Sequence, residues 1–348
     1  MSNHTSRRAF LAAVPAIALA TVSMTKTNVA HADEGGATLP ASPSAPVAIK
    51  SRVVRAVNEA LGTTLTLELE QAPFPAPGGA YRDATVIAFV PKHFRAARDG
   101  SVSVIVHFHG HSTTAERAMN AHQLREQLFD SKQNAILLVP EIAVMAPDSA
   151  AGKLETPGAF ARLVEDALRT LDARDARGAL GVAALPAGGG TVGRVCVSAH
   201  SGGYHAAALA LKHGGVGVRE VYLFDALYSD VDVFKDWVIA GRGKPMSSRH
   251  KLVSYFTAGT TENNTKKLFA DLAQAGVDVA SETVEGTLSR EELTHAEAVS
   301  IRTSLAHGKV TSELNGLRDC LYASALRRNL RTSWFESKTG ARPLERRR

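Results

Sequence analysis

Short apolar runs alternate with helix-like segments along most of the chain, and this alternation predicts its secondary structure. Residues 63–69 alternate between apolar and polar side chains, which predicts an edge or antiparallel strand. The run at 102–108 is typical of a central strand. The continuous apolar run at 135–139 is typical of a strand that helices cover on both faces. Further strands are predicted at 84–90, 195–198, 218–224, 252–256, 277–284 and 299–305.

Segments with apolar residues near helical spacing lie between these strands. Helices are predicted at 116–129, at 160–171, from the turn after residue 201 through 212, around 234–239, at 266–275 and at 311–328, with a glycine-rich loop at 178–193. Repeated strand–helix alternation requires right-handed crossovers and a mainly parallel sheet flanked by helices. We therefore expect a single α/β domain over residues 51–330, with ligands bound at the carboxyl ends of the strands.

The first 32 residues have the features of an export signal. Arg7 and Arg8 precede a modest apolar run, and Ala30-His-Ala32 forms a small-residue cleavage site. The run is shorter than the ~20 residues of a spanning helix, so we expect no stable membrane insertion. The arginine pair predicts a twin-arginine signal that the Tat export machinery reads, cleavage after Ala32, and a periplasmic or secreted protein. A standard secretory signal is the alternative.

The charge of the chain gives no indication of nucleic-acid binding. The net charge is +6, and the signal contributes three basic residues and no acidic ones. Those three removed from 40 basic residues leave 37 against 34 acidic residues, a net charge of +3. Much of this excess lies in residues 331–348, which we interpret as a flexible basic tail. Residues 33–50, rich in Ala, Pro, Ser and Gly, are interpreted as a disordered linker.

Ser201 lies at the turn between a predicted strand and a helix rich in small residues. Such a turn forces its central residue into a strained conformation, and it requires small neighbours such as Ala199 and Gly203. The segment Ala199-His-Ser-Gly-Gly203 resembles the nucleophile elbow of the α/β-hydrolases, in an A-H-S-x-G variant. A glycine-rich turn with an incidental serine is the alternative. The preceding His200 is interpreted as structural support for the turn.

A serine nucleophile needs a base and an acid that orients the base. In the α/β-hydrolases these residues follow in the order Ser, Asp or Glu, His. The resemblance implies His307 as the base, because it follows the last predicted strand; His295 is the alternative. For the acid we favour Asp225, at the end of the strand at 218–224, which is a known variation of a family that more often carries its acid one strand later. Glu262, in the loop after the next strand, is the alternative.

The oxyanion hole is assigned to backbone N–H groups of Gly202 and of a second residue near the end of the strand at 102–108. The segment His107-Phe-His-Gly-His111 resembles the H-G-G loop of the family, with His111 in place of the second glycine. The second donor is therefore either Gly110 or His111.

The same segment raises the possibility of a metal site formed by His107, His109 and His111, since imidazoles are zinc ligands. Alternate strand residues are about 6–7 Å apart, which is too wide for three ligands of one ion without bending. We therefore expect no metal. Polar side chains near the same strand ends are candidates for substrate binding: His109, Glu141 and Asp148. For Glu141 and Asp148, the alternative is that they are solvated loop residues.

Cys196 lies in a predicted strand and Cys320 in the predicted closing helix. Export permits a disulfide, but burial of both residues as small hydrophobic side chains is favoured.

The resemblance implies acyl transfer to water. Ser201, Asp225 and His307 would cleave an ester or amide bond through an acyl-enzyme intermediate, without a cofactor. The substrate would be a small molecule or a polymer that contains such a bond. Two hypotheses of other classes are a non-catalytic ligand-binding protein with the same fold and a metal-dependent hydrolase.

Overall fold

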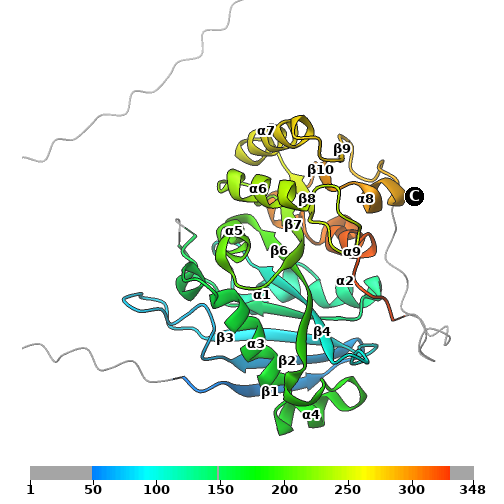
Figure 1. Ribbon diagram of the computed structural model, residues 1–348. Coiled ribbons are helices and arrows are strands. Elements are labelled where there is room, and N and C mark those ends of the chain that lie inside the picture. The colour runs from blue at the N-terminus through cyan, green and yellow to red at the C-terminus, as the bar shows by residue number, and fades with distance from the viewer. Residues whose placement is uncertain (1–48, 147–148, 330–348) are drawn as a thin grey trace, which may run out of the picture. The chain divides into compact units, whose positions relative to one another are not determined.

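The computed structural model describes residues 49–146 and 149–329 (Figure 1). The predicted export signal, residues 33–48 of the predicted linker, Asp148 and the tail at 331–348 lie outside the described residues. None of the described helices is long and apolar enough to cross a membrane.

Ten strands in the described part of the chain form one sheet, in the order β1-β2-β3-β5-β4-β6-β7-β8-β10-β9. The pairs β1–β2, β2–β3 and β3–β5 are antiparallel, and all later pairs are parallel. The predicted mainly parallel sheet flanked by helices is confirmed. The strands are β1 (Arg52–Asn58), β2 (Gly62–Glu68), β3 (Thr85–Pro91), β4 (Ser101–Phe108), β5 (Ala135–Pro140), β6 (Thr191–His200), β7 (Val218–Phe224), β8 (Lys251–Phe256), β9 (Val279–Glu282) and β10 (Ala298–Arg302).

The burial of each strand follows from its place in the sheet. β5 and β8 are buried at every position. The continuous apolar run of β5 predicts this, whereas β8 also buries Lys251 and Ser254. β1 is an exposed edge strand with two half-buried positions, Val53 and Val57. The sequence predicted the edge strand at residues 63–69, which form β2, because the arginines of β1 interrupt its apolar pattern.

Helices cover both faces of the sheet and bury two apolar cores (Figure 1). Side chains of α3, α4, α5, α6 and α7 belong to one core, and side chains of α1, α2, α8 and α9 to the other. The predicted burial of Cys196 and Cys320 is confirmed, and both lie in the second core. The helices are α1 (Ala115–Ala121), α2 (Leu124–Ser131), α3 (Ala159–Leu171), α4 (Arg174–Leu180), α5 (Tyr204–His213), α6 (Val231–Gly241), α7 (Thr260–Gln274), α8 (Arg290–His295) and α9 (Gly316–Tyr322).

Two long predicted helices are wrong. The helix predicted at 116–129 is broken into α1 and α2 at Gln123, whose φ of 51° lies in the left-handed region. The helix predicted at 311–328 is reduced to α9, because Leu314 and Asn315 also have positive φ and Arg328 forms a β-bridge with Gln133. These breaks are imposed by tertiary contacts that periodicity does not report.

Two predicted loops also differ from the structure. The loop expected at 178–193 contains the end of α4 and the first residues of β6. The Thr/Asn-rich loop expected after β8 forms the first turns of α7. There the hydroxyls of Thr261 and Thr265 contact Asp225 and Ser254, so residues of low helix propensity are retained for their hydrogen bonds.

Candidate active site

Ser201 begins the short 3-10 turn that joins β6 to α5, and its φ of 51° lies in the left-handed region. The turn is crowded on two sides. A Cβ on Gly203 would lie 2.4 Å from the carbonyl oxygen of Phe108, and a Cβ on Gly110 would lie 2.8 Å from the Ser201 Cβ. Only glycine fits at these two positions, and the close approach brings the end of β4 against the serine.

The structure brings Ser201, His307 and Asp225 into one hydrogen-bonded chain. His307 Nε2 lies 2.9 Å from Ser201 Oγ, and His307 Nδ1 lies 2.6 Å from Asp225 Oδ2. The three residues follow β6, β10 and β7, so all lie at the carboxyl ends of parallel strands. The His307 side chain is 43% exposed and the Asp225 side chain only 1%, so the imidazole is open to solvent while its carboxylate partner is buried.

Asp225 is held as a carboxylate by donors from one neighbouring segment. The Thr257 N–H donates to Oδ1 at 2.9 Å and the Thr257 hydroxyl to Oδ2 at 2.7 Å, while the Thr261 hydroxyl also donates to Oδ1. Burial raises the pKa of Asp225, but the hydrogen bonds from His307, Thr261 and Thr257 outweigh it and lower the pKa to about 2. Sequence reasoning missed both threonines; the Thr-rich segment after β8 was the available signal.

The alternative acid and base lie elsewhere. Glu262 Oε1 accepts a hydrogen bond from Lys266 on the first turns of α7. His295 is the last residue of α8, where its Nδ1 contacts the Glu291 carbonyl. Neither forms a hydrogen bond with Ser201 or His307.

A hydrogen bond fixes the orientation of the peptide between Gly110 and His111. His109 Nδ1 donates to the Gly110 carbonyl oxygen at 2.9 Å. In a trans peptide the next N–H points the opposite way, and His111 N lies 3.4 Å from the position that a Gly202 Cβ would take. The geometry therefore favours His111 N–H over Gly110 N–H as the partner of the Gly202 N–H.

His109 and Glu141, expected as substrate-binding residues, are instead buried behind this peptide. His109 Nε2 accepts from the Ile142 N–H at 3.0 Å and lies 3.1 Å from Glu141 Oε1. Glu141 Oε2 accepts from the Ala115 N–H at the start of α1. At 0% and 4% exposure, the two side chains are buried behind the Gly110–His111 peptide and are not open to solvent.

The three histidines of the proposed metal site do not converge. His107 is bonded to Ser198, His109 to the backbone of Gly110 and Ile142, and His111 is exposed. Within residues 49–146 and 149–329, no group of three or more His, Cys, Asp or Glu side chains has a metal-binding arrangement.

A row of buried histidines continues from His307 into the molecule. His200 Nε2 donates to the His307 carbonyl oxygen at 3.0 Å, and their ring centroids are 4.7 Å apart. His122 packs edge-on against His200, and its Nδ1 lies 3.2 Å from His107 Nε2. His107 Nδ1 lies 2.9 Å from Ser198 Oγ. The support that the sequence predicted for His200 thus extends over three histidines from separate segments.

These three histidines are neutral at neutral pH. Burial lowers the pKa of His200 to about 4 and that of His122 to about 3, and it lowers the pKa of His107 well below its usual value. The positive charges that neighbouring histidines would carry also lower the pKa of His122 and of His107. An uncharged, packed wall therefore lies behind the His307 ring.

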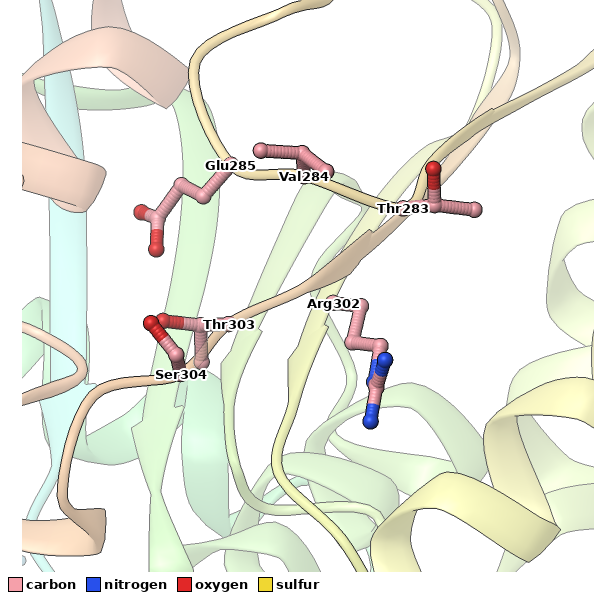
Figure 2. A pocket seen from close by; sticks show the side chains of 6 residues that line it. All are labelled: Thr283, Val284, Glu285, Arg302, Thr303 and Ser304. Atoms are coloured by element: carbon pink, nitrogen blue, oxygen red, sulfur yellow. The ribbon is translucent and has the colours of Figure 1, made fainter.

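Two pockets lie near the carboxyl ends of the strands. A recess of about 10 Å³ adjoins Gly110, His111 and Gly202. A larger pocket of about 220 Å³ lies beside the ends of β9 and β10. Figure 2 shows the Glu285 carboxylate and the Thr303 and Ser304 hydroxyls on one side of the larger pocket and Arg302 on the other. None of the three triad residues lines the larger pocket.

Comparisons with known proteins find likeness only among solved structures. No family model matches the chain, and no curated protein does. An S-formylglutathione hydrolase from Agrobacterium tumefaciens is similar at 11% identity and a TM-score of 0.46, over 79% of this chain and 100% of that chain. A feruloyl esterase module from Clostridium thermocellum is similar at 8% identity and a TM-score of 0.44, over 80% and 90%. At these values the likeness carries no argument about chemistry, so we base the functional interpretation on the side chains.

Proposed function

We propose that the protein is a serine hydrolase that cleaves an ester or amide bond through an acyl-enzyme intermediate. The observation that supports it most directly is the continuous hydrogen-bonded chain from Ser201 Oγ through His307 to the buried Asp225 carboxylate. A neutral serine hydroxyl is a weak nucleophile until a base takes its proton. An oriented imidazole with a carboxylate behind it supplies that base.

In the first half of the reaction, Ser201 Oγ attacks the substrate carbonyl carbon and its proton passes to His307 Nε2. The developing oxyanion accepts hydrogen bonds from the Gly202 and His111 N–H groups. The carbon–leaving-group bond then breaks, and His307 gives the proton to the departing oxygen or nitrogen. Asp225 stabilises the imidazolium throughout and stays ionised, in keeping with its pKa of about 2.

In the second half, His307 takes a proton from water and the hydroxide attacks the acyl group on Ser201. Collapse of this second intermediate releases the acid, and His307 returns the proton to Ser201 Oγ. No cofactor enters either half.

Hydrolysis of a panel of esters and amides by the purified protein tests the proposal. We expect turnover that Ser201→Ala abolishes and Ser300→Ala retains. Ser300 is a matched control, because it is a buried serine of the same sheet whose hydroxyl bonds only to Ser281 among the described residues. Equal activity of Ser201→Ala and the wild-type protein would overturn the proposal.

We also propose that the protein is exported through the twin-arginine route to the periplasm or the medium. The paired Arg7 and Arg8 before a short apolar run support this. Replacing both by lysine keeps the charge and removes the recognised pair, so the precursor should accumulate in the cytoplasm. Normal export of the double variant would exclude the twin-arginine route.

A further inference from the structure

The recess beside the oxyanion peptide is very small. It is lined by Gly110, His111, Ile142, Ala143, Ala146, Ser149, Ala150 and Gly202. Ile142, Ala143 and Ala146 are the buried apolar members of this lining. The three side chains are 4–6% exposed. A volume of roughly 10–15 Å³ is the smallest that admits one water-sized group, so the recess of about 10 Å³ leaves no room for a chain of several carbons.

The wall of the recess is held from behind. Ala143 and Ala146 pack against Phe74, whose ring lies 5.2 Å from that of Tyr81. The Lys153 N–H donates to the Pro73 carbonyl oxygen at 2.8 Å, which ties the segment after β5 to the segment before Phe74. Because Phe74 packs against Ala143 and Ala146, widening the recess requires displacement of a packed cluster.

Two partly exposed aromatic side chains, Tyr228 and Tyr204, lie beside His307. The Tyr228 ring stands edge-on to His307, with centroids 6.3 Å apart, and its side chain is 39% exposed. The Tyr204 ring lies next to the Tyr228 ring, with centroids 6.1 Å apart. Asn264 Nδ2 donates to the carbonyl oxygens of Leu227 and Tyr228 at 3.0 and 2.9 Å, which fixes the backbone under Tyr228.

The reaction assigns the two sides to the two parts of a substrate. His307 must give its proton to the leaving oxygen, so the leaving group lies on the side of His307 and Tyr228. The carbonyl oxygen lies between the Gly202 and His111 N–H groups. The acyl substituent then extends into the recess that these residues adjoin.

We propose that the substrate is an ester of a one- or two-carbon acyl group with a larger alcohol that has an apolar face. This inference rests on the proposed serine hydrolase function and specifies its substrate class. The small recess that Ile142, Ala143 and Ala146 help to line limits the acyl group, and Tyr228 contacts the alcohol. Water converts such an ester into a short carboxylic acid and the free alcohol, and no further reactant is needed.

Hydrolysis of 4-nitrophenyl acetate, butyrate and octanoate by the full chain tests the acyl limit, because the alcohol is constant. We expect kcat/KM to fall at least tenfold from acetate to butyrate and further to octanoate. Ile142→Ala should enlarge the recess and reduce the ratio of acetate to butyrate several-fold. Ile301→Ala is the matched control, since it removes the same atoms from a buried isoleucine of β10 in the other core. It should leave that ratio unchanged.

A second pair of measurements guards against an unstable Ile142→Ala. Ala143→Val narrows the recess and should lower kcat/KM for acetate by at least threefold. Tyr228→Ala should raise KM for 2-naphthyl acetate several-fold and change KM for ethyl acetate little. Octanoate turned over as well as acetate by the wild-type protein would overturn the acyl limit while the serine hydrolase proposal stands. No turnover of any ester, with no reaction at Ser201, would instead overturn the underlying function.

Discussion

The Asp225 carboxylate is buried and hydrogen-bonded to Thr257, Thr261 and His307. Its role can be tested by comparing its substitution with that of Glu262, the alternative acid. Asp225→Asn keeps the shape but removes the charge that stabilises the His307 imidazolium, so we expect kcat to fall about a thousandfold or more. Glu262→Gln makes the same chemical change on the first turn of α7, where the carboxylate bonds Lys266, and should alter kcat less than about twofold. Steady-state kinetics of the two variants decide between the acids. Equal losses, or a greater loss in Glu262→Gln, would contradict the assignment.

His200 acts as a positioning residue behind His307. His200→Phe keeps an aromatic ring against His307 and His122 but removes the N–H that bonds the His307 carbonyl. One such hydrogen bond is worth about 0.5–1.5 kcal/mol, so we expect kcat to fall roughly twofold to tenfold. KM for acetate esters should change little, since His200 does not face the substrate. An unchanged kcat, or a loss confined to KM, would show that His307 is positioned without this bond.

The residue-scale features that sequence reasoning missed are those that depend on contacts between distant segments. Ser201, Asp225 and His307 each follow a recognisable strand, so local pattern sufficed to select them. Thr257 and Thr261 were read only as a polar loop, because their bonds to Asp225 form when β7 and β8 pair. Nothing in the sequence around His122 indicates its role, because its contact with His200 joins two segments that are far apart in the sequence.

At the scale of elements, Lys251 joins β8 to the carboxyl end of α8. It is 1% exposed and its Nζ donates to the carbonyl oxygens of Leu293, Thr294 and Ala296. A cation at this end also suits the helix dipole. Burial lowers the pKa of Lys251 to about 8, so it remains mostly charged at pH 7.

Lys251→Met should therefore destabilise the protein, because buried carbonyls lose their donor. We expect the free energy of unfolding to decrease by about 1–3 kcal/mol. Lys267→Met, on the exposed face of α7, makes the same change where the side chain is 67% exposed and should cost little. Urea unfolding of both variants measures the difference. Equal stabilities would mean that α8 is held without this contact.

Strands were predicted better than helices, for a physical reason. An inner strand of this sheet is buried over its whole length, as β5 is, so its apolar run reveals it, whereas the exposed edge strand β1 was missed. Helix ends depend on where neighbouring elements require the chain to turn. The side chain of Gln127 illustrates this, because its Nε2 donates to the carbonyl oxygens of His122 and Thr311. These bonds hold the break between α1 and α2 and the segment before α9 in place, and the spacing of apolar residues does not reveal them.

At the scale of the whole molecule, buried neutral histidines make stability depend on pH. Burial lowers the pKa of His93 and His200 to about 4 and of His122 to about 3, with His107 also lowered. Below about pH 6.5 the unfolded chain binds protons that the folded chain does not, so stability falls as pH decreases from 6.5 towards 4. Each such group contributes about 1.4 kcal/mol per pH unit over this window.

We therefore expect the midpoint of urea unfolding to decrease steeply between pH 6.5 and 4.5 and to change little between pH 7 and 8. His122→Phe should make this midpoint less dependent on pH, by the contribution of one buried histidine. Asp225 adds a separate loss at lower pH, because its pKa of about 2 is below its usual 3.8 and its stabilisation disappears as pH falls through that range. A midpoint that is constant from pH 7 to 4.5 would contradict the burial of these histidines as neutral groups.

Covalent labelling of the purified protein with a fluorophosphonate tests the central claim most directly, because the reagent reacts with activated serines. The account predicts one adduct per chain, mapped by peptide mass to Ser201. It should be absent from Ser201→Ala, present in Ser300→Ala, and much slower to form in Asp225→Asn. A wild-type protein that forms no adduct, or an adduct that persists in Ser201→Ala, would contradict the claim that Ser201 is an activated nucleophile.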